Sequence, residues 1–123
     1  LNNWIINWNY DNINNYNNLE IKSFYSYKIV EEYFNNVYNV NDEKEIWWNK
    51  VKEYSAKYGF CPDVKEYKVC PDKYCGHVGD LCELIRASIT GKIITPDIYE
   101  ILKILDISSI EKRIKLFASY LNK

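Results

Sequence analysis

One stretch of the chain combines residues that could recognise a nucleic acid with signals for two helices that meet at a turn. Arg86 stands on an apolar helical pattern that ends near Gly91, and glycine suits the left-handed backbone conformation that closes a helix. Thr95 suits the capping position of the next helix, and Pro96 its first helical position, where a missing N–H is no loss. The planar guanidinium of the arginine and the hydroxyl of the threonine are both suited to reading an unpaired base.

Residues that could perform catalysis are sparse. The single histidine, His77, lies near Cys75 and Asp80, which makes a weak nucleophile pair at most. We expect His77 instead to precede or cap a helix that begins near Val78. The chain also contains no Gly-rich phosphate loop, so it offers no nucleotide site of its own.

Four cysteines and the histidine raise the question of a metal site. They fall close together, at Cys61, Cys70, Cys75, His77 and Cys82. Zinc sites favour cysteine pairs separated by two to four residues, and only Cys70 and Cys75 approach that spacing. Cys82 lies on an apolar stripe and is expected to be a small core residue. We therefore expect no metal here, and buried or free thiols in place of a disulfide framework.

Hydrophobic spacing predicts helices along most of the chain. One is expected in residues 22–39 and a second, capped by Asn41 or Asp42, ends at Gly59. Prolines and a glycine break residues 60–76 into short helical turns and loop. Further stripes follow, and they consist of Leu81, Leu84, Ile85 and Ser88, then Ile98, Ile101, Leu102 and Leu105, then Ile110, Ile114, Phe117 and Leu121.

The fold class that these patterns predict is all-α, a compact helical bundle or cage of about five to six helices. Ser108 and Glu111 have the spacing of a capping box for the last helix. A helical domain is expected over residues 22–123. Nine of the first eighteen residues are asparagine, so residues 1–21 are expected to be a peripheral or partly disordered segment.

Charge is modest and unevenly distributed. The chain has 123 residues and a net charge of −1, but the part from Arg86 to Lys123 carries +3 and the preceding part −4. A basic C-terminal part fits phosphate contact, and solvated helix faces explain it equally well.

No stretch is apolar for the length of a membrane span. The chain contains no methionine, which predicts a fragment or a processed product of something longer.

The residues around the turn resemble the C-terminal anticodon-binding domain of bacterial-type glutamyl-tRNA synthetases. That family places an arginine and then Ala-x-x-Thr-Gly on one helix, and opens the next with Thr-Pro-x-Leu-Phe/Tyr-Glu-Ile. The matching residues are Arg86, Ala87, Thr90, Gly91, Thr95, Pro96, Tyr99, Glu100 and Ile101. Weaker similarity upstream at Trp47-Trp48 and downstream at Arg113 extends the resemblance to roughly residues 29–121. Ile98 departs from the usual Leu. Asp106 departs from the usual helix-ending Gly, which predicts a tighter or strained turn before the last helix.

The resemblance implies an anticodon-binding module of a glutamate–tRNA ligase, which positions tRNA for glutamylation by a catalytic domain absent from this chain. The family's base-contacting positions carry over to Arg86, Thr95, Pro96, Ile98 and Tyr99. Lys92, Lys112 and Lys115 are candidate phosphate contacts. No catalytic residue, metal or cofactor is expected in this chain, because ATP and Mg²⁺ belong to the parent enzyme.

The partners that the resemblance implies are a glutamate-accepting tRNA and the parent catalytic domain, with no membrane and with a monomeric state. Whether a glutamine-accepting tRNA is also bound stays open. The expected location is the cytoplasm, or an organelle of an AT-rich eukaryote.

A second function, a helical protein–protein interaction domain without an RNA ligand, also fits the sequence. It would use the aromatic residues 22–58 as its docking surface. Each candidate RNA contact has a structural explanation as well. Arg86 could form an ion pair with Asp97 or Glu100, Thr95 could be a plain cap, and Ile98 could belong to the core.

Overall fold

The computed structural model describes residues 19–121, and these form a predominantly helical fold. The α-helices are α2 (Tyr27–Glu32), α3 (Lys44–Lys57), α4 (Val64–Val69), α5 (Val78–Thr90), α6 (Ile98–Ile104) and α7 (Ile107–Leu121). A π-helical turn, η2 (Tyr33–Val37), continues α2, and a 3-10 turn, η3 (Pro71–Lys73), follows α4. The predicted all-α class is confirmed. The proposed Asn-rich segment 1–21 lies almost wholly outside the described residues.

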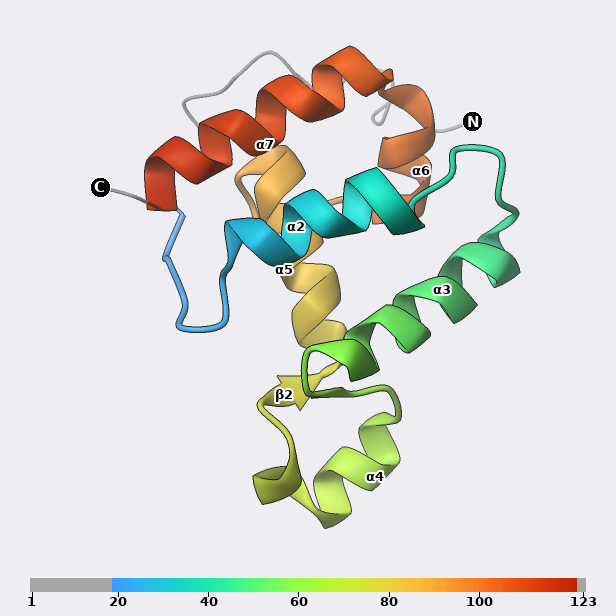
Figure 1. Cartoon of the computed structure of the whole chain (residues 1–123), viewed down its shortest axis with the longest axis vertical. Coiled ribbons are helices and arrows are strands. Elements are labelled where there is room, and N and C mark those ends of the chain that lie inside the picture. Colours follow the sequence, from blue (N-terminus) through green and yellow to red (C-terminus); the bar gives the residue numbers. More distant parts are fainter. Residues whose placement is uncertain (1–18, 122–123) are drawn as a thin grey trace.

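The described residues contain one small sheet that the sequence did not predict. Strand β1 (Phe60–Cys61) pairs in parallel with β2 (Gly76–His77), and each strand has only two residues. The pairing closes the segment that contains α4 and η3, which Figure 1 shows at the far end from α7.

Helix α5 is the central element of the core. It runs from β2 towards α7, while α2 and α3 flank it on the viewer's side in Figure 1. Its buried apolar side chains are Val78, Leu81, Leu84, Ile85, Ala87 and Ile89. Phe117 of α7, Tyr33 of η2 and Val51 of α3 are each at most 1% exposed. The amphipathic stripes predicted for these segments therefore do face one shared core.

The first described helix is shorter than the predicted helix 22–39. It begins at Tyr27 because Ser26 caps it, with the serine Oγ accepting from the backbone N–H of Ile29. The chain before Ser26 is held to α5 by side chains and not by helical hydrogen bonds. Lys22 Nζ and the Tyr25 hydroxyl both donate to the carboxylate of Glu83, at 3.0 and 3.1 Å.

One predicted helix start is confirmed. His77 caps α5, with its Nδ1 accepting from the Gly79 N–H at 3.0 Å, and Asp80 accepts from the His77 N–H at 2.9 Å. Helix α3 was expected to be capped by Asn41 or Asp42, and that is wrong. Its N-cap is Glu43, which makes no side-chain cap bond, while Asp42 forms an ion pair with Lys50 at 2.7 Å.

Aspartates replace the predicted hydroxyl caps at the last two helices. Helix α6 begins at Ile98, so Thr95 is not its cap and Pro96 is not its first residue. Asp97 caps it, accepting from the Tyr99 N–H at 3.0 Å. Asp106 caps α7 in place of Ser108, accepting from the Ser109 N–H at 2.7 Å. A carboxylate is at least as good a cap as a hydroxyl, and its charge also complements the helix dipole.

The turn between α6 and α7 is short but adopts no left-handed conformation. Only Leu105 and Asp106 separate the two helices, and Leu105 is extended with ψ 138°. No non-glycine residue between 19 and 121 has a positive φ. The aspartate that stands in the family's glycine position is thus used as a helix cap, and the turn is tight without backbone strain of that kind.

The cap at Asp106 gives the protein a pH-dependent contribution to stability. The hydrogen bonds from Ser109, its backbone N–H first, lower the pKa of the Asp106 carboxyl. A lowered folded-state pKa contributes stability above the unfolded-state pKa, and this is lost as the pH falls through the folded-state value. We expect Asp106→Ala to lower the melting temperature at pH 7 and Ser108→Ala to leave it unchanged. The difference should shrink below about pH 3.9. Equal melting temperatures for the two variants at pH 7 would contradict the cap assignment.

Candidate nucleic-acid interface

Arg86 and Thr95 are in direct contact, which the sequence did not predict. Arg86 Nε donates to Thr95 Oγ1 at 2.8 Å, and the threonine hydroxyl donates to the carbonyl of Pro96 at 2.7 Å. No described residue accepts a hydrogen bond from the two terminal nitrogens of the guanidinium. The arrangement holds the plane of the guanidinium in place and leaves those donors for a ligand.

The ion pair that could have explained Arg86 structurally is not formed within residues 19–121. Asp97 pairs with Lys44 instead, through Oδ2, while its Oδ1 caps α6. Glu100 makes no ion pair with the arginine among the described residues either. The partner of Arg86 within residues 19–121 is therefore neutral, and no carboxylate in that part of the chain is bonded to the guanidinium.

The charges of Arg86 and Asp97 also act on the thiol of Cys82. Burial raises the pKa of its thiol to about 11, the positive charge of Arg86 opposes that shift, and the negative charge of Asp97 adds to it. The thiol is therefore protonated at neutral pH. This agrees with the small core residue that the sequence predicted, and not with a reactive thiolate.

Three hydrogen bonds fix the end of α5. Gly91 adopts φ 72° and its N–H donates to the Ala87 carbonyl at 2.8 Å. Thr90 Oγ1 donates to the Arg86 carbonyl at 2.8 Å and accepts from the Lys92 N–H at 3.1 Å. These hydrogen bonds connect the last turn of α5, including the backbone of Arg86, to the loop that follows it.

Arg113 of α7 completes this support from across the core. Its Nη1 donates to the Ile89 carbonyl at 2.9 Å, and the residue is only 5% exposed. The sequence reasoning noted Arg113 only as a family match and did not foresee this role. A signal was present, because Arg113 borders the apolar stripe of α7 formed by Ile110, Ile114 and Phe117.

The other candidate base contacts have buried side chains. Ile98 is 2% exposed, Tyr99 is 7% exposed and Pro96 is buried. The Tyr99 hydroxyl donates to the Asp42 carbonyl at 2.7 Å, and its ring packs against Trp47 with centroids 5.3 Å apart. These three side chains hold α6 against the rest of the fold.

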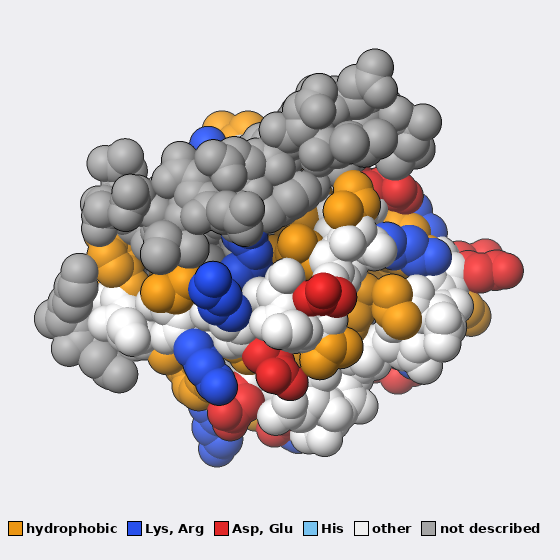
Figure 2. All heavy atoms as spheres, turned by 90° about the horizontal axis from the view of Figure 1, so that it is seen from above, with side chains coloured by type: hydrophobic (Ala, Val, Ile, Leu, Met, Phe, Trp, Pro, Cys, Tyr) orange, Lys and Arg blue, Asp and Glu red, His pale blue; other side chains and the backbone are white. Residues whose placement is uncertain are grey.

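The candidate phosphate contacts lie at two places. Lys92 is exposed in the loop after α5, and Lys112 and Lys115 are exposed on α7. Figure 2, which views the molecule from the α7 side, shows lysine or arginine side chains interspersed with carboxylates and apolar groups. The visible described surface is therefore mixed in charge and not uniformly basic.

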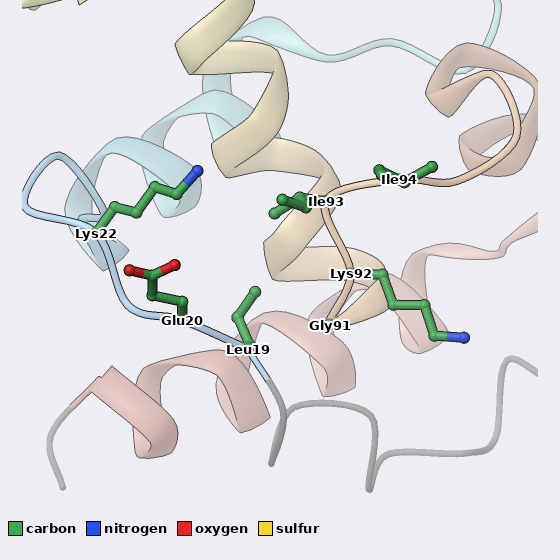
Figure 3. Close-up of a pocket in the computed structure, with 7 residues that line it drawn as sticks. All are labelled: Leu19, Glu20, Lys22, Gly91, Lys92, Ile93 and Ile94. Carbon is green, nitrogen blue, oxygen red and sulfur yellow. The ribbon is translucent and has the colours of Figure 1, made fainter.

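A hollow of about 410 Å³ lies beside the loop that leads to Thr95. It is lined by Leu19, Glu20, Lys22, Gly91, Lys92, Ile93 and Ile94. Figure 3 shows Leu19 and Ile93 facing the same space, while Lys92 and Ile94 point away from it. Its volume is in the range of ligand sites, and its lining mixes apolar and charged groups.

Within residues 19–121 the metal-type side chains do not assemble. No three histidine, cysteine or carboxylate side chains there come close enough to hold one ion. Cys61 is buried, Cys70 and Cys75 are exposed, and all of them are free thiols, as is Cys82. In the same part of the chain, no helix has both the length and the apolar character needed to cross a bilayer.

The geometry defines a class of protein: an all-α domain that presents an oriented arginine and threonine where two helices meet. The chain is 36% identical over 90 residues to a glutamate–tRNA ligase of Clostridium perfringens (strain SM101 / Type A), and 36% identical over 88 residues to that of Acetivibrio thermocellus. The Sorangium cellulosum glutamate–tRNA ligase is 34% identical over 76 residues. The chain is thus a relative of the glutamate–tRNA ligases, and the resemblance seen in its motifs is confirmed.

The match is local with respect to these relatives. It covers 73% of this chain and 16% of the Clostridium perfringens SM101 protein, and 62% and 13% for the Sorangium protein. The chain therefore spans about one sixth of the length of the curated relatives it matches. No family model and no solved structure matches the chain.

The buried guanidinium of Arg113 makes a stability prediction. Arg113→Met keeps much of the side-chain volume but leaves the Ile89 carbonyl without this donor, so we expect the free energy of unfolding to fall by about 1–3 kcal/mol. Urea denaturation measures the loss. The adjacent exposed Lys112 is a matched control, and Lys112→Met should change stability by less than about 0.5 kcal/mol. If the two variants were equally stable, Arg113 would not support the end of α5.

Proposed function

We propose that this chain is the anticodon-binding domain of a glutamate–tRNA ligase, and that it holds the anticodon loop while a catalytic domain outside this chain attaches glutamate. The observation that carries the proposal is the Arg86–Thr95 pair. Nε is bonded to the threonine at 2.8 Å, while the terminal nitrogens have no partner among the described residues. The relatives named above add support, because they are glutamate–tRNA ligases.

In this proposal Arg86 and Thr95 read an unpaired base. The guanidinium can stack on the base or donate to its edge with the terminal nitrogens, and the hydroxyl can take part from the other side. Contacts from Pro96, Ile98 and Tyr99 would use the backbone or the exposed edges of these residues, since their side chains are buried. Their main contribution is to place Thr95.

The remaining parts of the proposal concern the partners of the parent protein. Lys92, Lys112 and Lys115 would meet phosphates of the tRNA, while ATP and Mg²⁺ would be bound by the catalytic domain. The protein would act in the cytoplasm as a monomer. Whether a glutamine-specific tRNA is also accepted would depend on which anticodon bases can bind to Arg86 and Thr95.

The protein-interaction alternative has no specific observation in its favour. Several of the aromatic side chains on which it relied are buried in the core. Tyr33, Trp47 and Tyr54 are 1%, 5% and 5% exposed.

The first test concerns base reading. Using the 123-residue chain and RNA hairpins that carry the glutamate anticodon loop or single-base variants of it, we expect Arg86→Ala to lower the preference for the cognate loop by about 5- to 150-fold. Fluorescence anisotropy gives the dissociation constants. Lys65→Ala, an exposed change on the distant helix α4, is the control for a lost positive charge. An unchanged preference in Arg86→Ala, with an unchanged melting temperature, would refute the reading role.

The second test separates phosphate contact from base reading. Charge removal at Lys92, Lys112 or Lys115 should weaken binding of all hairpins by a similar factor, because phosphates carry no sequence information. Each removed contact should also lower the slope of log affinity against log salt by about 1. A variant that alters the preference between hairpins but not the salt slope would contradict the phosphate assignment for that lysine.

A further inference from the structure

Two adjacent tryptophans on α3 lie in different environments. Trp47 is 5% exposed and packs against Tyr99, while Trp48 is 36% exposed. Their ring centroids are 6.0 Å apart. A tryptophan is rarely buried completely, and the partial exposure of Trp48 leaves an aromatic face that a ligand can reach.

The exposed indole shares a face of α3 with a lysine that contacts the start of α6. Lys44 is four residues before Trp48 on the same face of α3, and it forms the ion pair with Asp97. Asp97 caps α6 two residues after Thr95. Trp48 is therefore about 6 Å along the helix axis from Lys44, whose side chain joins α3 to Asp97.

The surroundings of Trp48 are polar. Lys52 follows one turn later on the same face, and Glu45 and Asn49 are exposed neighbours. The exposed apolar side chain nearest in sequence is Ile46, 48% exposed, which lies towards the opposite side of the helix. One aromatic ring with lysines on the same helix face suits an unpaired base. Stacking of a base needs only a single π-face, and the phosphate backbone of the RNA beside that base needs cations. A protein partner would call for a wider apolar surface.

We propose that Trp48 stacks on an unpaired base of the bound tRNA, next to the base that Arg86 reads. This inference rests on the proposed function and adds a contact to it. The stacking would supply affinity with little sequence preference, because every base has a π-face. Reading would remain with Arg86 and Thr95.

The test uses the 123-residue chain and the same hairpins, with two substitutions at one position. Trp48→Phe keeps an aromatic face, whereas Trp48→Leu keeps an apolar side chain without one. We expect Trp48→Leu to weaken binding of the cognate hairpin by about 5- to 150-fold and Trp48→Phe by less than about threefold. Ile46→Ala is the matched control on the same helix and should bind as the wild type does.

Hairpins with one abasic nucleotide identify the stacked base. For one loop position the difference between wild type and Trp48→Leu should disappear, because the base that stacks is already missing. If Trp48→Leu binds every hairpin as tightly as the wild type, this inference is wrong, and the effect of Arg86→Ala still decides the proposed function separately. An equal loss in both Trp48 variants on all hairpins, with lowered melting temperatures, would make Trp48 a structural residue and also overturn the inference. If the wild type binds no hairpin, both proposals fail.

Discussion

The termination of α5 at Gly91 is the constraint on which the candidate interface depends. The helix carries the centre of the core, so it cannot shift along its axis without exposing Leu84 and Ile85. It must then end where Gly91 turns left-handed, at φ 72°. The last turn is secured from within by Thr90 and from α7 by Arg113. The chain that leaves this turn has only a few residues in which to reach α6.

That short connection brings Thr95 back to Arg86. The start of α6 is fixed independently, because Tyr99 is anchored to the Asp42 carbonyl and to Trp47, and Asp97 is anchored to Lys44. With both ends of the loop held, the Thr95 hydroxyl meets Arg86 Nε at 2.8 Å. Under the proposed function, the core residues of α6 would serve recognition indirectly, by placing a threonine.

Much of this could be predicted from the sequence, because helical periodicity reports burial directly. The stripes of α5, α6 and α7 appear where the spacing placed them, and Gly59 and Gly91 end helices as expected. Helix starts were harder to predict, since several capping residues compete within a few positions. At α6 and α7 the N-cap is an aspartate and not the nearby residue with a hydroxyl group. The Thr95 hydroxyl instead accepts a hydrogen bond from Arg86.

Contacts between distant segments lay beyond sequence reasoning. Spacing showed that Arg86 and Thr95 belong to adjoining helical segments, but it could not show which of Thr95, Asp97 and Glu100 the guanidinium would meet. The Arg113 contact depends on how α7 packs against the end of α5, and the Lys44–Asp97 pair depends on how α3 lies against the start of α6. The partial exposure of Trp48 likewise depends on how α3 packs. Local periodicity carries no information on such packing.

A double-mutant cycle in RNA binding would show whether Arg86 and Thr95 act as one recognition unit. The affinity of the cognate anticodon hairpin would be measured for the wild type, Arg86→Ala, Thr95→Ala and the double variant. If the threonine acts mainly by holding the guanidinium, the double variant should bind about as weakly as Arg86→Ala alone, with a coupling free energy of about 1 kcal/mol. Strictly additive losses, or no loss from either single change, would contradict the account.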